Sequence, residues 1–208
     1  MKYRWIVGCG DFLDTAFHAW KQFRPDELIK RVEVRQNADY AFDCSVLDTL
    51  DPAKGSAFIA FNERFGNFKR LELMQAAIDH GLNLEPFISP MANVATDVAI
   101  GPNSFIGHHA CIGHGSRIGF NTVIHNSVQI GIHSTINASC WIESGVQVGD
   151  NVEIGAHGIL RMGAMIKKGT TVGDGCELGW PRLYHEDIPS KTVFDLRYDE
   201  PIYVYPGT

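Results

Sequence analysis

The chain has 208 residues, which suits one or two domains, and its 45% hydrophobic and 20% charged residues are typical of a globular protein. Its formal net charge of −6 argues against nucleic acid or an acidic membrane surface as the main partner. We expect no signal peptide and no membrane span, because no apolar stretch approaches about 18 residues. The five cysteines include no CxxC pair, so we expect reduced thiols and a cytoplasmic protein.

The N-terminal part of the chain alternates short apolar runs with helical patterns. The run at 3–7 ends in the glycine turn Gly8-Cys9-Gly10, and apolar residues then recur at helical spacing from Phe12 to Phe23. Further elements are predicted as strands at 32–34, 40–42, 57–61 and 82–88 and as a helix at 65–80. Strands that alternate with helices predict a small parallel α/β domain over residues 1–88.

The glycine turn resembles part of a dinucleotide-binding fingerprint. A turn between a strand and a helix can place backbone N–H groups and a helix N-terminus at a phosphate. Asp11 follows the turn, and no third glycine or small residue completes the motif, which argues against NAD. The turn is therefore either a phosphate contact or simply a tight turn.

A strict hexad repeat occupies the middle of the chain. Every sixth residue is aliphatic, without an insertion, at Val94, Ile100, Ile106, Ile112, Ile118, Ile124, Ile130, Ile136, Ile142, Val148, Ile154, Leu160, Ile166, Val172 and Leu178. A small or β-branched residue recurs four positions after these anchors, and glycine often follows them directly. This period predicts a short strand and a turn per hexad, with the anchor pointing inward. Three hexads make one coil, so the fifteen predict a parallel β-helix of five coils, about 24 Å long.

Histidines are concentrated in the hexads, and none occupies an anchor position. They are His108, His109, His114, His125, His133 and His157. Because they lie between anchors, these histidines are predicted to project from turns or outer faces of the β-helix. The spacing of His109 and His114 is similar to that in γ-class carbonic anhydrases, zinc enzymes built on the same prism, but residues 81–107 contain no third histidine. We therefore expect no metal, with a carbonic anhydrase-like zinc protein as an alternative.

Several short motifs, in their order along the chain, resemble one protein family. They are Gly8-Cys9-Gly10, Phe58-Ile59-Ala60-Phe61-Asn62 with Arg70 after it, Ile88-Ser89-Pro90-Met91-Ala92 at the start of the hexads, and Asp187-Ile188-Pro189. Together they resemble the two-domain nucleotide-sugar acetyltransferases. This family includes sialic acid O-acetyltransferases and the UDP- or GDP-4-amino-sugar N-acetyltransferases of bacterial glycan pathways. The resemblance implies a left-handed β-helix over 89–179 and leaves 180–208 as a C-terminal extension.

The resemblance also implies a function. We expect an acetyl-CoA-dependent acyltransferase that N-acetylates a nucleotide-linked amino sugar in surface-glycan biosynthesis, with acetyl-CoA as cosubstrate. The family is trimeric, with acetyl-CoA between neighbouring prisms, so we expect a homotrimer. Phe105, Phe120 and Trp141 occupy outward hexad positions and are predicted interface anchors. The alternatives are a sugar O-acetyltransferase and a non-catalytic β-helix that binds a nucleotide sugar or a partner protein.

The family's binding residues can be carried over to matching positions. Gly8, Cys9, Gly10 and Asn62 are expected near the nucleotide sugar, with Asp39 as a possible base contact or a solvated loop residue. Ser144, Gly145 and Gly163 are expected along the acetyl-CoA. The Gly145 N–H would face the thioester carbonyl and stabilise the oxyanion. Lys167 and Lys168 are either phosphate contacts for CoA or part of a solvated face.

The catalytic base is where the chain departs from the family. The family pattern is an aliphatic anchor, any residue, and then histidine. If the rung of Gly145 is matched to the family, Asn126 takes the position of the family's histidine, and His125 lies one residue before it. If the match is shifted by one rung, the candidate is His133, which lies one residue after that position. A histidine suits general-base catalysis near neutral pH, whereas Asn126 can only hydrogen-bond the substrate. His125, His133 and a mechanism without a protein base are the three alternatives.

Overall fold

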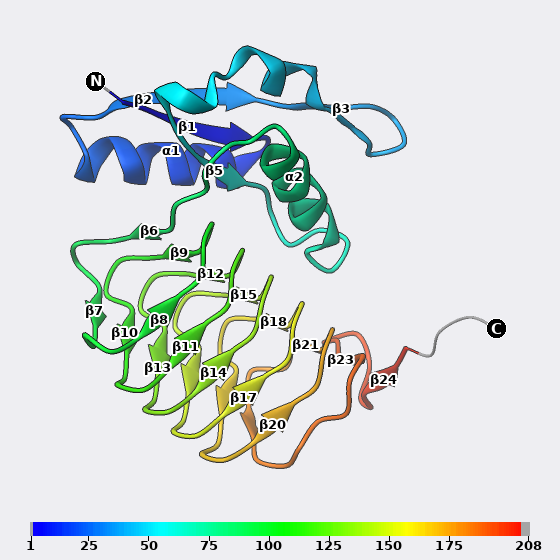
Figure 1. Ribbon diagram of the computed structural model, residues 1–208. Helices are drawn as coiled ribbons and strands as arrows, with labels where there is room; N and C mark the ends of the chain where they lie inside the picture. The colour runs from blue at the N-terminus through cyan, green and yellow to red at the C-terminus, as the bar shows by residue number, and fades with distance from the viewer. Residues whose placement is uncertain (1, 205–208) are drawn as a thin grey trace. The chain divides into compact units, whose positions relative to one another are not determined.

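The computed structural model describes residues 2–204, and the chain divides into two compact units, Met1–Phe87 and Ile88–Thr208 (Figure 1). Residues 205–208, the end of the predicted C-terminal extension, lie outside the described residues. Within 2–204, no helix combines the length and apolar character that crossing a membrane requires.

The N-terminal unit is built on a three-stranded parallel sheet. Its strands are β1 (Tyr3–Gly8), β2 (Leu28–Glu33) and β5 (Gly55–Ala60), in the order β2-β1-β5. β1 is the central strand, and its residues from Arg4 onward are all buried. Its two helices are α1 (Asp11–Phe23), which buries one apolar face including Leu13 and Trp20, and α2 (Phe68–Asp79). The predicted parallel α/β domain is confirmed.

Two predicted strands of this unit are wrong; at 40–42 only Phe42 is in a strand, because Tyr40 has a left-handed backbone with a φ of 60°. Smaller elements complete this unit. They are the antiparallel pair β3 (Arg35–Gln36) and β4 (Phe42–Asp43), and the 3-10 helices η1 (Cys44–Thr49) and η2 (Pro52–Lys54). In the predicted strand at 82–88, Leu84 forms only an isolated bridge with Ala57, before the short strand β6 (Phe87–Ile88). Pro86 has no amide hydrogen, so a regular ladder cannot pass through it.

The C-terminal unit is a left-handed parallel β-helix, seen as stacked coils in Figure 1. Each hexad forms one two-residue strand, and the anchor is its second residue. The strands are β7 (Asn93–Val94), β8 (Ala99–Ile100), β9 (Phe105–Ile106), β10 (Cys111–Ile112), β11 (Arg117–Ile118), β12 (Val123–Ile124), β13 (Gln129–Ile130), β14 (Thr135–Ile136), β15 (Trp141–Ile142), β16 (Gln147–Val148), β17 (Glu153–Ile154), β18 (Ile159–Leu160), β19 (Met165–Ile166), β20 (Thr171–Val172) and β21 (Glu177–Leu178).

The strands form three faces, and three corners join them. The first face runs from β7 to β19, the second from β8 to β20 and the third from β9 to β21, with each strand paired to the strand 18 residues away, as in Ile112↔Ile130. We call the turns after each face the first, second and third corners. The first corner holds 95–98, 113–116, 131–134, 149–152 and 167–170; the second holds 101–104, 119–122, 137–140, 155–158 and 173–176. The third holds 89–92, 107–110, 125–128, 143–146, 161–164 and 179–182.

The hexad pattern has a direct physical explanation in this fold. The anchors from Ile106 to Leu178 are buried in one continuous core, because the inside of the prism excludes water. The small residues four positions later are also buried, and where they are hydroxylic they bond to the next coil. Ser116 Oγ donates to the Gly131 carbonyl and Ser134 Oγ to the Gly149 carbonyl, both at 2.9 Å. The polar corner residues are thus satisfied inside the core.

The third residue after each anchor from Ile100 to Val172 has a left-handed backbone. Asparagine, serine, histidine or glycine occupies this position at 103, 109, 115, 121, 127, 133, 139, 145, 151, 157, 163, 169 and 175, all with positive φ. Asparagine, histidine and above all glycine tolerate this region better than most residues. His109, His133 and His157 therefore lie at turn positions that the coil geometry itself favours.

The chain continues the β-helix beyond the predicted five coils. β22 (Leu183–Tyr184) pairs with β19, Ile188 bridges Val172, and β23 (Thr192–Phe194) pairs with β21. These contacts add a sixth coil, whose core is closed by Tyr184, Ile188 and Phe194. β24 (Ile202–Tyr203) then pairs antiparallel with β23.

Two of the three predicted interface anchors are not on the surface. Phe105 is 3% exposed and Trp141 is 7% exposed, whereas Phe120 is 40% exposed. Phe105, Val123, Trp141 and Ile159 stand in register on the third face, and all four are buried. The prediction that Phe105 and Trp141 are exposed interface anchors is therefore wrong, although both occupy outward hexad positions.

Candidate functional site

The third corner brings together five of the predicted site residues. His125, Asn126, Ser144, Gly145 and Gly163 occupy this corner in three successive coils. Three other predicted residues lie elsewhere: His133, Lys167 and Lys168 belong to the first corner. A single chain therefore does not assemble the full predicted set.

His125 is held against the protein. Its backbone N–H donates to the Ile142 carbonyl at 2.9 Å, and its ring packs edge-on against Trp141 with centroids 4.5 Å apart. The side chain is half-buried, and its Nε2 atom is buried. His125 as the catalytic base stays a prediction.

Asn126 has a role in joining adjacent coils. Its Oδ1 accepts a hydrogen bond from the His108 backbone N–H at 2.9 Å. Asp150 and Asp174 occupy the same position two residues after an anchor, and they accept from Ile132 N–H at 3.1 Å and Ala156 N–H at 2.7 Å. Asn126 therefore repeats a structural contact of the prism.

His108 is a candidate that the sequence-based selection missed. Its Nδ1 lies 2.9 Å from Ser89 Oγ, and Ser89 is only 1% exposed. His108 is half-buried in the third corner, one coil before Asn126. The segment Ile106-Gly107-His108 matches the pattern of anchor, any residue and histidine, so a search of every coil for that pattern would have found it.

The predicted oxyanion donor is already engaged. Gly145 has a φ of 76°, and its N–H donates to the Asn126 carbonyl at 3.2 Å. An oxyanion role for this N–H would compete with that bond. Ser144, directly before it, is exposed at the tip of the turn.

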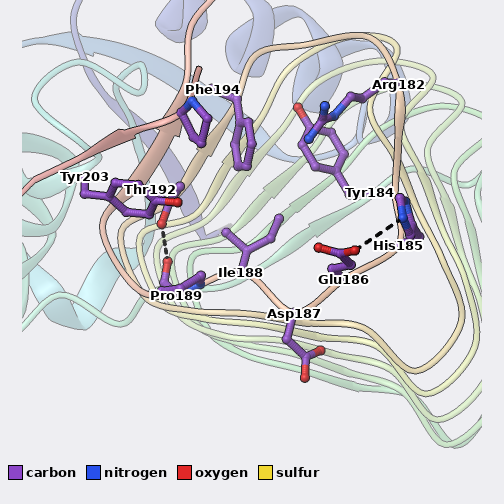
Figure 2. A pocket seen from close by; sticks show the side chains of 11 residues that line it. Arg182, Tyr184, His185, Glu186, Asp187, Ile188, Pro189, Thr192, Phe194 and Tyr203 are labelled. Atoms are coloured by element: carbon purple, nitrogen blue, oxygen red, sulfur yellow. Dashed lines mark hydrogen bonds and ion pairs between the residues drawn. The ribbon is translucent and has the colours of Figure 1, made fainter. Parts of the chain in front are cut away.

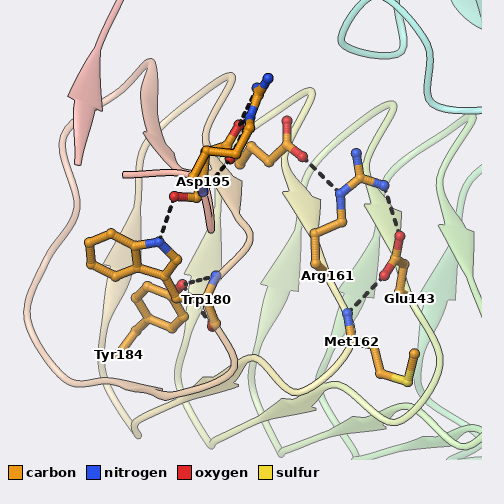
Figure 3. Close-up of polar contacts among 8 residues, drawn as sticks. Glu143, Arg161, Met162, Trp180, Tyr184 and Asp195 are labelled. Carbon is orange, nitrogen blue, oxygen red and sulfur yellow. Dashed lines mark hydrogen bonds and ion pairs between the residues drawn. The ribbon is translucent and has the colours of Figure 1, made fainter. Parts of the chain in front are cut away.

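A cavity of about 370 Å³ opens further along the third corner. Figure 3 shows three of its lining residues, Glu143, Arg161 and Met162. Arg161 lies between two carboxylates there, 2.8 Å from Glu143 and 2.8 Å from Glu177. Met162, which is 69% exposed, lines the cavity together with Leu196 from the C-terminal segment. Apolar and polar side chains both line this cavity, which suits the arm of a CoA thioester, where short apolar segments alternate with amide groups.

A second cavity, of about 200 Å³, lies at the sixth coil (Figure 2). The Arg182 guanidinium stands over the rings of Trp180, Tyr184 and Phe194, at 4.7, 5.1 and 5.2 Å from their centroids. None of the predicted site residues lines this cavity. Burial raises the pKa of the Tyr184 hydroxyl, which bonds to the backbone of Trp180.

The first corner presents its predicted residues to solvent. The ring of His133 lies where a side chain on Gly115 would be, and its backbone has a φ of 55°. Lys167 and Lys168 are exposed, and Lys168 Nζ is 3.9 Å from Asp150, a loose ion pair. Both lysines are accessible to an anionic ligand.

In the N-terminal unit, the glycine turn stands at the carboxyl end of β1. A side chain at Gly8 would collide with the Ala60 carbonyl oxygen, and Gly10 has a φ of 73° at the start of α1. Burial, with help from Glu33, raises the pKa of the Cys9 thiol, while Arg64 lowers it. Cys9 follows β1, Glu33 ends β2 and Arg64 follows β5, so these three segments lie close together at the carboxyl edge of the sheet. Ligands usually bind at this edge in parallel α/β sheets.

The remaining predicted contacts of this unit are polar loop residues. Asn62 Oδ1 accepts from Arg64 N–H at 3.2 Å, so it shapes the loop after β5. Asp39 is exposed in the turn between β3 and β4, where its N–H bonds to Asn37. No group of three or more histidine, cysteine or acidic side chains within 2–204 is placed to hold a metal ion.

No protein-family model matches the chain, and no curated protein matches it. Solved structures do match it, and their fold is that of hexapeptide-repeat nucleotide-sugar acetyltransferases. One is PerB from Caulobacter crescentus with CoA and GDP-perosamine, at 23% identity over 93% of both chains with a TM-score of 0.81. A variant of that perosamine N-acetyltransferase, with one histidine replaced by asparagine, holds the same two ligands.

Two further neighbours span nearly the whole chain. The acetyltransferase domain of PglB from Neisseria gonorrhoeae, with acetyl coenzyme A, is 21% identical over 97% of this chain and 99% of its own, with a TM-score of 0.67. WeeI from Acinetobacter baumannii AYE is 16% identical over 97% and 100%, with a TM-score of 0.70. At these identities the likeness establishes the fold, including the left-handed β-helix.

Proposed function

We propose that the protein is an acetyl-CoA-dependent acyltransferase that N-acetylates a nucleotide-linked amino sugar. The observation that carries this proposal is the match over 93% of both chains to a structure that holds CoA and GDP-perosamine. The N-terminal unit would bind the nucleotide sugar at the carboxyl edge of its sheet, and the third corner would bind the donor. We place the activity in the cytoplasm and in surface-glycan biosynthesis, as the resemblance and the thiol state of all five cysteines suggest.

The proposed chemistry needs three contributions from the protein. It must orient the sugar amine, remove a proton from it and stabilise the negative charge that develops on the thioester oxygen. Backbone N–H groups and polar side chains of the third corner are candidates for the last two tasks. Acetyl-CoA supplies the acetyl group as a thioester.

We include a homotrimer in the proposal. Lys167 and Lys168 lie in the first corner, and Ser144 and Gly145 lie in the third, so one chain cannot place all four on one donor molecule. A neighbouring copy can bring its first corner beside the third corner of this chain. The site would then be complete only in the assembly.

The test is acetyl transfer from acetyl-CoA to a panel of UDP-, dTDP- and GDP-linked amino sugars. CoA release is followed with a thiol reagent, and the product is identified by mass spectrometry. An increase of about 42 Da on one amino sugar is expected for N-acetylation. Transfer to a hydroxyl of a sugar without an amine would instead indicate an O-acetyltransferase.

The second candidate is a non-catalytic protein that binds a nucleotide sugar or a partner. Two points favour it: in the register set by Gly145, Asn126 takes the family's histidine position, and the Gly145 N–H is engaged with the Asn126 carbonyl. The asparagine variant of the perosamine enzyme still holds both of its ligands. Thermal stabilisation by a nucleotide sugar, without transfer to any member of the panel, would support this candidate.

A further inference from the structure

A groove on the sheet of the N-terminal unit lies apart from the predicted site residues. It has a volume of about 790 Å³, and its lining comes from β1, β2 and the 3-10 helices η1 and η2. None of Gly8, Cys9, Gly10 and Asn62 lines it. We propose that this groove binds a small organic anion, a phosphate or carboxylate with an apolar body, at a site separate from that of the nucleotide sugar. The inference goes beyond acyl transfer and does not depend on it.

The floor of the groove is formed by β1 and β2. Tyr3 and Trp5 of β1 stack with their ring centroids 5.8 Å apart, and Trp5 is paired with Lys30 in the parallel register. Because side chains alternate between the faces of a sheet, Tyr3, Trp5 and Lys30 share one face. Trp5 is only 4% exposed, so its ring is fixed by packing. The floor is therefore preformed, as is usual for small-molecule sites.

The groove is open because two short helices cover this face only in part. The longer helix α2 packs on β5 and η1. η1 buries Leu47, and Leu50 directly after it is also buried, but Val46 is only half-buried and Thr49 is exposed. Val46 and Leu50 both line the groove and give it an apolar wall.

Positive charge exceeds negative charge around the groove. Three cationic and two acidic side chains line it, although the whole chain has a formal net charge of −6. Arg31 is compensated, because its Nη1 lies 2.9 Å from Glu33. Lys54 is compensated as well, since its Nζ lies 3.0 Å from Asp51. These two pairs leave the charge of Lys30.

Lys30 is the residue that selects an anion. Its Nζ lies 4.5 Å from the centroid of the Tyr3 ring, and no carboxylate among the described residues forms an ion pair with it. The ring attracts the ammonium group without neutralising its charge. A ligand anion would gain an ion pair with Lys30 while its apolar body contacts Val46 and Leu50. A cation would be repelled, and a neutral ligand would gain no ion pair.

The experiment is calorimetric titration of the full-length protein with naphthyl phosphate, whose two parts can also be tested separately. We expect one site per chain and an affinity at least about tenfold higher than for either inorganic phosphate or naphthol, because only the whole molecule uses both the cation and the apolar wall. An excess of CoA and of UDP- or GDP-linked amino sugar should leave the affinity within a few fold, since neither is expected in this groove.

Two variants locate the bound anion. Lys30→Gln should weaken binding about tenfold, as expected for the loss of one charged contact. Thr49→Trp should abolish binding, because a bulky side chain fills the groove without changing its charge. Lys21→Gln is the matched control: its Nζ also lies over an aromatic ring, 5.7 Å from the centroid of Phe17, but it does not line the groove. Its affinity should equal that of the wild type.

Three results would overturn the inference. They are no binding of naphthyl phosphate to the wild type, an affinity that both Lys30→Gln and Thr49→Trp leave unchanged, and displacement of the anion by CoA or the nucleotide sugar. Displacement would assign the anion to the donor or substrate site. The melting temperature of each variant shows whether the fold is intact. None of these results bears on the proposed function, which acetyl transfer tests by itself.

Discussion

The histidines of the β-helix fall into two groups: some serve the turn geometry of the fold, and others make side-chain contacts. His109, His133 and His157 lie at left-handed turn positions, where the coil needs a residue that accepts positive φ. His108 and His125 lie elsewhere in the third corner and make side-chain contacts of their own. The number of histidines is therefore a weak guide to catalysis, and their position within the hexad is a better one.

His80 provides a pH-dependent test at the residue scale. Its pKa is raised, chiefly because Nδ1 bonds to the Ala76 carbonyl at 2.7 Å and also because Nε2 is 3.0 Å from Asp48. A raised folded-state pKa means that His80 stabilises the fold fully below its unfolded pKa, about 6.5, and that this contribution is lost as the pH rises through the folded value. NMR titration should find its pKa above 6.5, and Asp48→Asn should lower it. An unchanged value in that variant would mean that the ion pair is absent in solution.

The two exposed lysines of the first corner give a second residue-scale test. Lys167→Ala combined with Lys168→Ala should weaken CoA more than dephospho-CoA, because each lysine is a compact cation suited to a phosphate. Isothermal titration with both ligands measures the difference. Lys21→Ala, on an exposed part of α1, is the control for a general change in charge. Equal affinities for the double variant and the wild type would assign the pair to a solvated face.

At the scale of the element, the hexad is readable from sequence because every coil repeats the same physical requirements. An inward aliphatic anchor, a small corner residue and a left-handed turn recur without interruption, so the strands and the core were predictable. The sixth coil was not, because its inward positions include the aromatic residues Tyr184 and Phe194, and Ile188 follows Tyr184 after only four residues. The strand predicted at 82–88 is wrong because its apolar run contains Pro86, which has no amide hydrogen to donate to a regular ladder.

The left-handed turns can be tested with a pair of variants at one site. Asn151 is exposed and has a φ of 52°. Asn151→Ala should lower the melting temperature by about 2–4 °C, since an ordinary residue in this region costs about 1 kcal/mol. Asn151→Gly should leave it nearly unchanged, because glycine accepts this conformation. An equal decrease in melting temperature in both variants would mean that the asparagine side chain, and not the backbone conformation, stabilises this turn.

The candidate site was only partly predictable, and the reason lies in the coil geometry. Sequence spacing identified Asn126, Ser144 and Gly145 as neighbours, and the structure does place them in one corner. It could not reveal that the Asn126 side chain bonds to His108 or that Ser89 lies against the His108 ring, because those contacts join residues 18 and 19 positions apart. Hydrogen bonds between coils, invisible in a linear pattern, decide which histidine is oriented.

For the whole molecule, the separation of the predicted donor residues into two corners leads to a prediction about assembly. If the proposed trimer shares its sites, the third corner of one chain works with Lys167 and Lys168 of its neighbour. A Ser144→Trp chain, whose third corner is blocked by a bulky side chain, and a Lys167→Ala, Lys168→Ala chain would each form defective sites alone. Co-expressed with different tags, they form mixed trimers in which one of the three interfaces combines an intact third corner with an intact first corner.

Mixed trimers purified through both tags should therefore recover a substantial fraction of wild-type kcat, although each parent variant is weak. The physical reason is that the two substitutions fall on opposite sides of a shared interface, so mixing separates them. Two single-tag preparations combined without co-expression are the control, because their subunits do not exchange during the assay. Mixed trimers no more active than the average of the two parents would mean that each site is built within one chain. A monomer in light scattering at micromolar concentration would remove the shared site altogether.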